Sequence, residues 1–200
     1  MIRDFQKYKR RSIRLQGYDY SKNGSYFVTI CTHNRECLFG ETVDGEMQLN
    51  DAGKMIQKWW NKLETKFSNI ILDEHVVMPN HFHGILMITN KTKSVGAIPC
   101  NRPQCGITKN HFNQGENMVS PLRILNSYNG LGQYISWFKR MSTNEYIQNV
   151  KLGKFLPFEK RIWQRNYHEH IIRNEKDYFT ITQYILDNPM KWEIDEYYSS

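Results

Sequence analysis

The chain has 200 residues, of which 40% are hydrophobic and 14% aromatic, so it can bury a core and is not of the disordered class. Lysine and arginine exceed aspartate and glutamate by 27 to 20, and the net charge of +7 favours a polyanionic partner such as a nucleic acid. The charged start of the chain lacks the apolar segment of a signal peptide, and no apolar run approaches the roughly twenty residues of a membrane span. We therefore expect a cytoplasmic protein, not a membrane protein, with free thiols.

The first part of the chain predicts a basic arm, a strand and a hairpin. Residues 1–22 bring arginines and tyrosines together, which indicates an arm outside the core. Residues 24–33 are rich in β-branched and aromatic residues, as strands are. Residues 37–50 predict a small hairpin, because the pair Asp44-Gly45 at their centre favours a tight turn.

A helix and two strands are expected next. Residues 50–67 carry apolar side chains at helical spacing, and Asn50 or Asp51 can cap the helix. Residues 70–78 and 81–88 are strand-like and are separated by only a short turn, which requires antiparallel neighbours.

The second half of the chain begins with a segment that has little periodicity. Residues 90–129 hold prolines, glycines and asparagines and predict a long surface insertion. Helical spacing returns over residues 130–150, and residues 161–173 predict a strand. A last helix is expected between its cap, Asn174, and Pro189.

The order of these elements predicts the fold class. Strand, helix, two antiparallel strands, helix, strand and helix indicate an α+β protein of the ferredoxin-like, split βαβ type, with helices packed on an antiparallel sheet. The sequence shows no internal repeat and no second domain, so we expect a single domain over residues 1–200.

The first chemical signal is a pair of histidines in a strand otherwise composed of buried residue types. His81 and His83 are two positions apart and so project from the same face of the strand, while Phe82 projects into the opposite layer. The two imidazoles can converge on one divalent cation. The alternative is a pair of structural histidines at a strand edge, each satisfied by hydrogen bonds.

The chain contains a second pair with the same spacing, so spacing alone cannot rank the two. His168 and His170 are separated by Glu169, which indicates a wetter position than Phe82 gives the first pair. We interpret the second pair as polar surface or as a substrate contact.

The last helix supplies a third signal. Tyr184 and Asn188 are four residues apart and share a helix face. A phenolic oxygen can act as a nucleophile beside a cation, and an amide oxygen suits Mg²⁺ or Mn²⁺. The alternative for Tyr184 is a half-buried helix tyrosine. Tyr178 is the competitor, but its position aligns with the core face of the helix.

These residues carry a resemblance to a known family. The stretch "MPNHFHGI", followed later by "WQRNYHEHIIRNEKDYFTITQYILDNP", resembles the single-tyrosine HUH transposases, which include the enzymes of simple insertion sequences and the REP-associated tyrosine transposases. The stretch "RRSIRLQGYDYSKNGSYFVTICTHNRECLFG" is similar to the N-terminal segment of the second group. The match covers most of the chain except residues 90–129.

The resemblance implies a site and a reaction. His81 and His83 match the metal-binding histidines, Asn188 the third ligand and Tyr184 the nucleophile, with Mg²⁺ or Mn²⁺ as cofactor. The implied function is that of a DNA transposase of a bacterial mobile element, an endonuclease that cleaves and rejoins single-stranded or hairpin DNA through a 5′-phosphotyrosine link. Because the imidazoles must be neutral to bind a metal, activity is expected to fall as the pH drops through about 6.5.

The same reading assigns DNA contacts to basic and aromatic residues, each of which is otherwise a solvated surface residue. The expected contacts are Arg10, Arg11, Arg14, Tyr18, Tyr20, Trp163, Gln164, Arg165 and Arg173. The sequence leaves open whether the protein is a monomer or a homodimer.

Four alternatives remain at this level. One is a domesticated protein that binds hairpin DNA with little or no cleavage, and another is a rolling-circle replication initiator or relaxase. A third is an RNA-binding module, since ferredoxin-like sheets also present aromatics to single-stranded RNA. The fourth is a small zinc protein that uses Cys100, Cys105 and His111, although their spacing is wider than in a zinc knuckle.

Overall fold

The computed structural model describes residue 15 and residues 17–89 and 130–198. The expected insertion, the arginines of the arm and the cysteines of the zinc alternative lie outside these residues. In chain order the elements are β1 (Gly24–Cys31), β2 (Gly40–Val43), β3 (Glu46–Leu49), α1 (Asp51–Lys66), β4 (Ile70–Val77), β5 (His81–Ile88), α2 (Leu131–Lys151), β6 (His168–Ile172) and α3 (Glu175–Asp187). Short 3₁₀ turns lie at His33–Arg35 and Trp192–Ile194. Among the described helices, none has both the length and the apolar character needed to cross a membrane.

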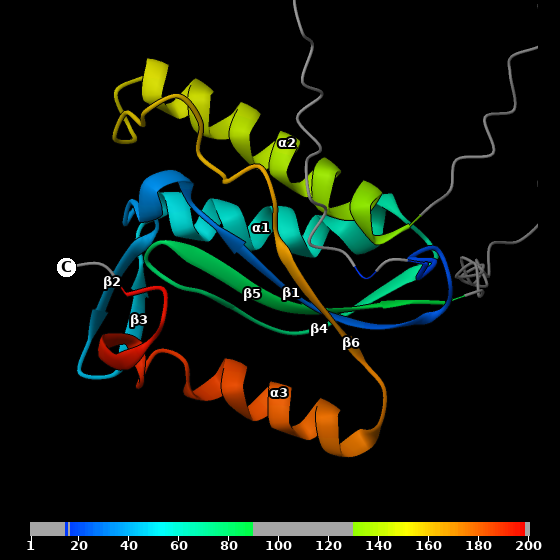
Figure 1. The fold of residues 1–200 in the computed structure, drawn as a ribbon. Coiled ribbons are helices and arrows are strands. Elements are labelled where there is room, and N and C mark those ends of the chain that lie inside the picture. The colour runs from blue at the N-terminus through cyan, green and yellow to red at the C-terminus, as the bar shows by residue number, and fades with distance from the viewer. Residues whose placement is uncertain (1–14, 16, 90–129, 199–200) are drawn as a thin grey trace, which may run out of the picture.

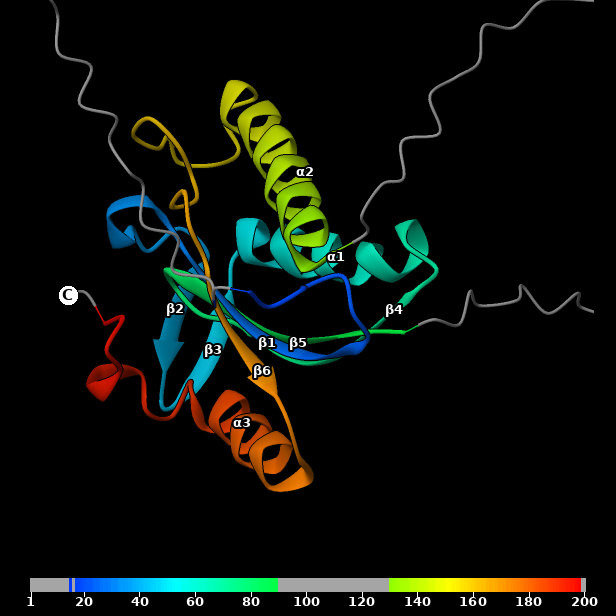
Figure 2. The ribbon, with the colours of Figure 1, turned by 45° about the vertical axis from the view of Figure 1, so that its right-hand side comes forward.

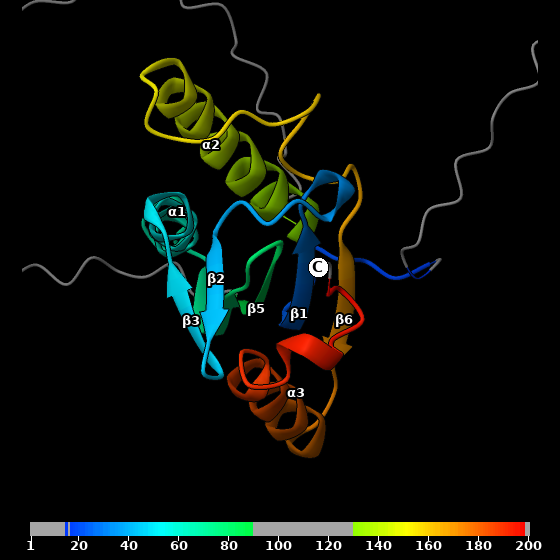
Figure 3. The same ribbon diagram turned by 90° about the vertical axis from the view of Figure 1, so that its left-hand side faces the viewer.

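The described chain forms a four-stranded antiparallel sheet with the order β4-β5-β1-β6. Helices α1 and α2 cover one face of the sheet, and α3 lies across the other (Figures 1 and 3). Since β1, α1, β4, β5, α2 and β6 follow one another in the chain, this is the ferredoxin-like, split βαβ arrangement that the sequence predicts. The hairpin of β2 and β3 is inserted between β1 and α1.

Local sequence signals explain where the elements begin. The side chain of Asn50 accepts a hydrogen bond from the backbone of Gly53 at 2.9 Å, and that of Asn174 accepts one from Asp177 at 2.9 Å, so α1 and α3 each begin with an N-cap. In the hairpin, Asp44 and Gly45 have φ values of 51° and 78°, the left-handed pair that a tight turn between twisted strands requires.

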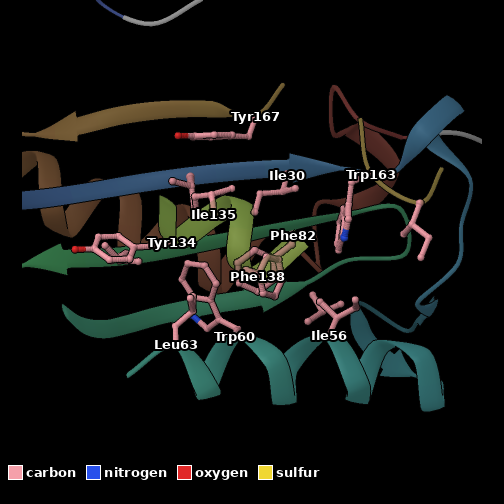
Figure 4. Packing of buried hydrophobic residues seen from close by; sticks show 14 of the residues in the cluster. Ile30, Ile56, Trp60, Leu63, Phe82, Tyr134, Ile135, Phe138, Trp163 and Tyr167 are labelled. Carbon is pink, nitrogen blue, oxygen red and sulfur yellow. The ribbon is translucent and has the colours of Figure 1, made fainter. Parts of the chain in front are cut away.

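The main core lies between the sheet and the pair α1 and α2 (Figure 4). Phe82 packs there with its ring centre 4.6 Å from that of Trp60 and 5.5 Å from that of Phe138. A side chain at position 84 would meet Trp60 at 2.7 Å, so glycine at this point lets the indole pack closely against β5. Phe82 thus anchors the strand on one face while its neighbours project from the other.

The strand expected over residues 161–173 is shorter than predicted. Only His168–Ile172 pair with β1, and residues 161–167 form an irregular segment joined to the sheet by one bridge between Thr32 and Trp163. Trp163 is 4% exposed, and its indole donates a hydrogen bond to the hydroxyl of Ser142 at 3.0 Å. The segment is therefore held by side-chain packing rather than by a ladder of backbone hydrogen bonds.

Candidate active site

The site begins with the two histidines of β5. His81 and His83 are fully buried and face α3, and their ring centres lie 4.5 Å apart. On the neighbouring strand β1, Cys31 pairs with His81 and Thr29 pairs with His83. The strand thus fixes the positions of both imidazoles at the same end of the sheet.

The tautomer of His81 follows from its neighbour Asn80. The amide nitrogen of Asn80 donates to the carbonyl oxygens of Arg35 at 3.2 Å and Tyr197 at 2.8 Å, so the amide oxygen is left as an acceptor. That oxygen lies 2.9 Å from Nδ1 of His81, which must therefore carry the proton. Nε2 of His81 then presents a lone pair, and it has no hydrogen-bond partner in the described structure.

His83 is held in a similar way by a hydroxyl group. Its Nδ1 lies 2.8 Å from Oγ1 of Thr29, and its Nε2 lies 3.4 Å from the hydroxyl of Tyr184. Burial lowers the pKa of His83 well below its usual range and lowers the pKa of His81 to about 3. Both imidazoles are thus neutral at physiological pH, the form in which histidine binds metals.

Tyr184 reaches the histidines from α3. Its side chain is 37% exposed, and its ring makes edge contacts with His83 and Phe27 at 5.2 and 6.0 Å. Burial, followed by the charges of Asp195 and Glu196, raises the pKa of Tyr184 to about 12. The competitor in the same helix points elsewhere, since the hydroxyl of Tyr178 donates to Asp73 on β4 at 2.7 Å.

Asn188 completes the expected set and brings in a residue that the sequence reading missed. Asn188 is 1% exposed, and its Nδ2 donates to Oδ2 of Asp195 at 3.0 Å. Because a carboxylate can only accept, the amide oxygen of Asn188 must point the other way, where it has no hydrogen-bond partner in the described structure. Asp195 also accepts from the backbone of Tyr197 at 2.7 Å, and the Tyr184 hydroxyl lies 3.5 Å from its Oδ2.

The unpartnered atoms test whether these residues suit a divalent cation. Nε2 of His81 and Oδ1 of Asn188 are both buried acceptors without a donor in the described chain, an arrangement that is costly unless a cation lies between them. Ligand atoms of His81, His83 and Asp195 lie within 4.8 Å of one another. Two imidazole nitrogens with an amide and a carboxylate oxygen form a mixed donor set that suits Mn²⁺, Mg²⁺ or Zn²⁺. The residues therefore fit the expected metal.

The second histidine pair lies on the edge strand β6 and is exposed. Nε2 of His170 lies 2.9 Å from Oδ2 of Asp177 in the first turn of α3. His168 pairs with Thr29 and borders a cavity of about 510 Å³ that Phe27 and Tyr184 also line. The volume lies within the range of roughly 300–1,000 Å³ found for ligand sites. This second pair is thus exposed to solvent, as predicted, and lines the cavity beside Tyr184.

The other predicted contacts have varied positions. Tyr18 is half-buried, and its hydroxyl lies 3.3 Å from that of Tyr26. Trp163 is a core residue whose indole packs against Phe138 of α2, and its role as a DNA contact stays a prediction. Arg165 and Arg173 are exposed, Gln164 is half-buried, and Arg10, Arg11 and Arg14 lie outside the described residues.

The fold and the site define an α+β protein with a buried histidine pair, a tyrosine and a donor set suited to a divalent cation. The chain is 38% identical over 189 residues to an uncharacterized protein of Haemophilus influenzae (strain ATCC 51907 / DSM 11121 / KW20 / Rd), a match that covers 94% of this chain and 93% of that protein. The chain belongs to the same family as that protein. No model of a known protein family matches the chain.

Two solved structures are similar to this chain. One is a REP-associated tyrosine transposase bound to a REP hairpin, with a TM-score of 0.48, 21% identity, and coverage of 89% of this chain and 73% of that chain. The other is a candidate transposase from Deinococcus radiodurans R1, with a TM-score of 0.45, 14% identity, and coverage of 87% and 97%. At these TM-scores, an assignment of activity depends on the site itself.

Proposed function

We propose that this protein is a metal-dependent DNA transposase of the single-tyrosine class, which cuts and rejoins single-stranded or hairpin DNA through a 5′-phosphotyrosine link. The observation that carries the proposal is the distance of 3.4 Å between the Tyr184 hydroxyl and Nε2 of His83, beside a second imidazole with an unpartnered lone pair. A nucleophile and a cation site at this separation can act on one phosphate group.

The residues that would hold the cation are His81, His83 and Asn188, with Asp195 as an additional oxygen donor. A divalent cation there would polarise the scissile phosphate and offset the negative charge that develops during attack. Asn80 and Thr29 hold the imidazoles with Nε2 turned into the site, which is how residues behind metal-binding histidines usually act.

Tyr184 would form the covalent link. Its hydroxyl loses a proton, the phenolic oxygen attacks phosphorus, and the bond from phosphorus to the 3′ oxygen breaks. The carboxylate of Asp195, 3.5 Å from the hydroxyl, is placed to receive that proton, and the departing 3′ oxygen takes up a proton to become a hydroxyl. Since the link keeps the energy of the phosphodiester, a second 3′ hydroxyl can reverse the step and join strands.

The motif resemblance and the cavity beside Tyr184 support the proposed substrate class. The cavity of about 510 Å³ beside Tyr184 is lined by Phe27, His168 and Thr180, among others, and offers an aromatic ring next to polar groups. Single-stranded nucleic acid is bound through such stacking surfaces. A hairpin with a single-stranded flank would supply the strand to be cut.

The test is strand cleavage of a labelled hairpin with a single-stranded flank in Mn²⁺, resolved on denaturing gels. The wild-type protein is expected to give a cleaved strand and a slower covalent adduct. Tyr184→Phe is expected to give neither product. Tyr178→Phe is the matched control, because it removes one hydroxyl from the same helix, and it should keep cleavage within a few-fold of the wild type.

Three other results would contradict the proposal. Cleavage by Tyr184→Phe at the wild-type rate would show that another group attacks. Binding without cleavage in every metal tested would favour the domesticated binding protein. Metal-independent binding of single-stranded RNA in preference to DNA would favour the RNA-binding module.

A further inference from the structure

The segment from α2 to β6 has a marked excess of basic residues. Residues 139–165 contain seven basic and two acidic residues, a net of five positive charges against seven for the whole protein. Six of the basic side chains are exposed and define what we call the α2–β6 basic surface. They are Arg140, Lys151, Lys154, Lys160, Arg161 and Arg165. The segment comprises the C-terminal part of α2 and the irregular chain that leads from it to β6 (Figure 2).

These charges are not used inside the described protein. None of the six makes an ion pair with another described residue. Of the two acidic residues, Glu145 is engaged with Lys58 and with the indole of Trp59 at 2.8 Å, on the side of α1. The surface therefore keeps its positive field, apart from Glu159, and attracts polyanions.

The basic surface is tied to the candidate active site through hydrogen bonds. The backbone of Gln164 donates to the carbonyl of Cys31 at 2.9 Å, and Cys31 is the strand partner of His81. The ammonium group of Lys139 donates to the carbonyls of Gln164 and Arg165 at 2.5 and 3.1 Å, which fixes this part of the segment on α2. Arg165 thus lies at the end of the sheet where His81 lies, three residues before β6, whose His168 borders the cavity beside Tyr184. The rest of the basic surface lies on the α2 side of the sheet, opposite α3, so a bound polyanion would reach Tyr184 by passing the β6 edge (Figure 1).

The aromatic residues of the segment face inward. Tyr146 is 1% exposed, and Phe155 and Phe158 pack on its ring at 5.0 and 5.6 Å. Trp163 belongs to the core. Single strands are bound through exposed aromatic rings, whereas a duplex backbone requires only cations, so this surface suits duplex phosphates. The cavity beside Tyr184, with Phe27 in its wall, suits the single strand.

We propose that the α2–β6 basic surface binds the phosphate backbone of the duplex stem of a hairpin substrate and directs its single-stranded flank to Tyr184. The proposal rests on the proposed function for the identity of the substrate. Contacts between this surface and the phosphates would bind the stem whatever its base sequence.

The test measures DNA binding in the Tyr184→Phe background, so that cleavage does not interfere. The variant replaces Lys151, Lys154 and Lys160 with glutamine. The matched control replaces the exposed Lys54, Lys62 and Lys66 of α1 with glutamine, which removes the same charge from another part of the surface. Fluorescence anisotropy follows three probes: the flanked hairpin, a blunt duplex of the same stem, and the single strand alone, over a range of salt concentrations.

The α2–β6 variant is expected to lose about tenfold or more of its affinity for hairpin and duplex at about 0.1 M salt, and its salt slope should fall by about two to three units. The control should stay within twofold of the parent on all probes. Equal losses in both variants, or a loss confined to the single strand, would overturn the proposal. If the parent itself binds no duplex, the proposal fails as well.

The two proposals fail separately. If the α2–β6 variant keeps the duplex affinity of its parent, the proposed role of this surface is wrong, but the proposed role of Tyr184 is not affected. Cleavage by Tyr184→Phe would refute the proposed chemistry, but it would not change what the DNA-binding measurements say about the α2–β6 basic surface.

Discussion

The chain contains two His-x-His pairs of identical spacing, and the structure gives them opposite environments. His81 and His83 lie on an inner strand with no exposed surface, whereas His168 and His170 lie on an edge strand in contact with solvent. In the first pair, Asn80 contacts Nδ1 of His81 and Thr29 contacts Nδ1 of His83, so that each Nε2 faces the candidate metal site. In the second pair, Nε2 of His170 already contacts Asp177. Burial and the contacts at Nδ1, rather than spacing, therefore distinguish the pair that we propose to bind the metal.

The comparison predicts a large difference in metal binding. His81→Gln and His83→Gln remove one imidazole each while keeping much of the side-chain volume, and each should weaken Mn²⁺ binding by at least about 100-fold, because even residues behind a ligand cost 10- to 100-fold. His168→Gln and His170→Gln should stay within a few-fold of the wild type. Isothermal titration calorimetry measures all four. Equal effects at the two pairs would remove the distinction drawn here.

A smaller effect is expected when the hydroxyl behind His83 is removed. Thr29→Val keeps the shape of the side chain but leaves Nδ1 of His83 without its partner at 2.8 Å, so the metal affinity should fall by about 10- to 100-fold. Thr29→Ser keeps the hydroxyl and serves as the control, with an affinity close to that of the wild type. If Val and Ser bind the metal equally well, the hydroxyl does not orient His83.

The smallest effect concerns the stability of the metal-free protein against pH. Burial lowers the pKa of His81 to about 3, whereas in the unfolded chain it is about 6.5. Between these values the unfolded chain binds more protons, so the free energy of unfolding is greatest above about pH 6.5 and falls as the pH drops towards 3. His81→Gln should reduce this fall, as urea titrations at pH 7 and pH 4.5 would show. An unchanged slope in the variant would assign the pH dependence to other groups.

Much of the fold follows from local signals. Asn50 and Asn174 are capping residues that begin helices where expected, and the Asp44-Gly45 pair forms the turn between β2 and β3. The extent of the last strand could not be read in the same way. Tryptophan is a residue type that is common in strands. The indole of Trp163, however, packs in the core and donates a hydrogen bond to Ser142, and such a long-range contact cannot be predicted from sequence periodicity.

The site was predictable where it lies on regular elements. The two-residue spacing in a strand and the four-residue spacing in a helix indicated which side chains share a face. Asp195 could not be found this way, because it follows the last 3₁₀ turn in irregular chain. Asn80 directly precedes His81 in the sequence, and this adjacency is the one sequence signal that could have indicated its contact with the imidazole. Thr29 acts across the sheet, and only the register between β1 and β5 brings it to His83.

The central claim is that Tyr184 and the ion held by the buried histidines act on one phosphate. The most direct measurement is mass spectrometry of the covalent adduct formed when the protein is incubated with flanked hairpin DNA and Mn²⁺, then digested. The account predicts a nucleotide joined through its 5′ phosphate to Tyr184, and no adduct with His83→Gln. An adduct on another residue, or cut DNA with no attached peptide, would contradict it.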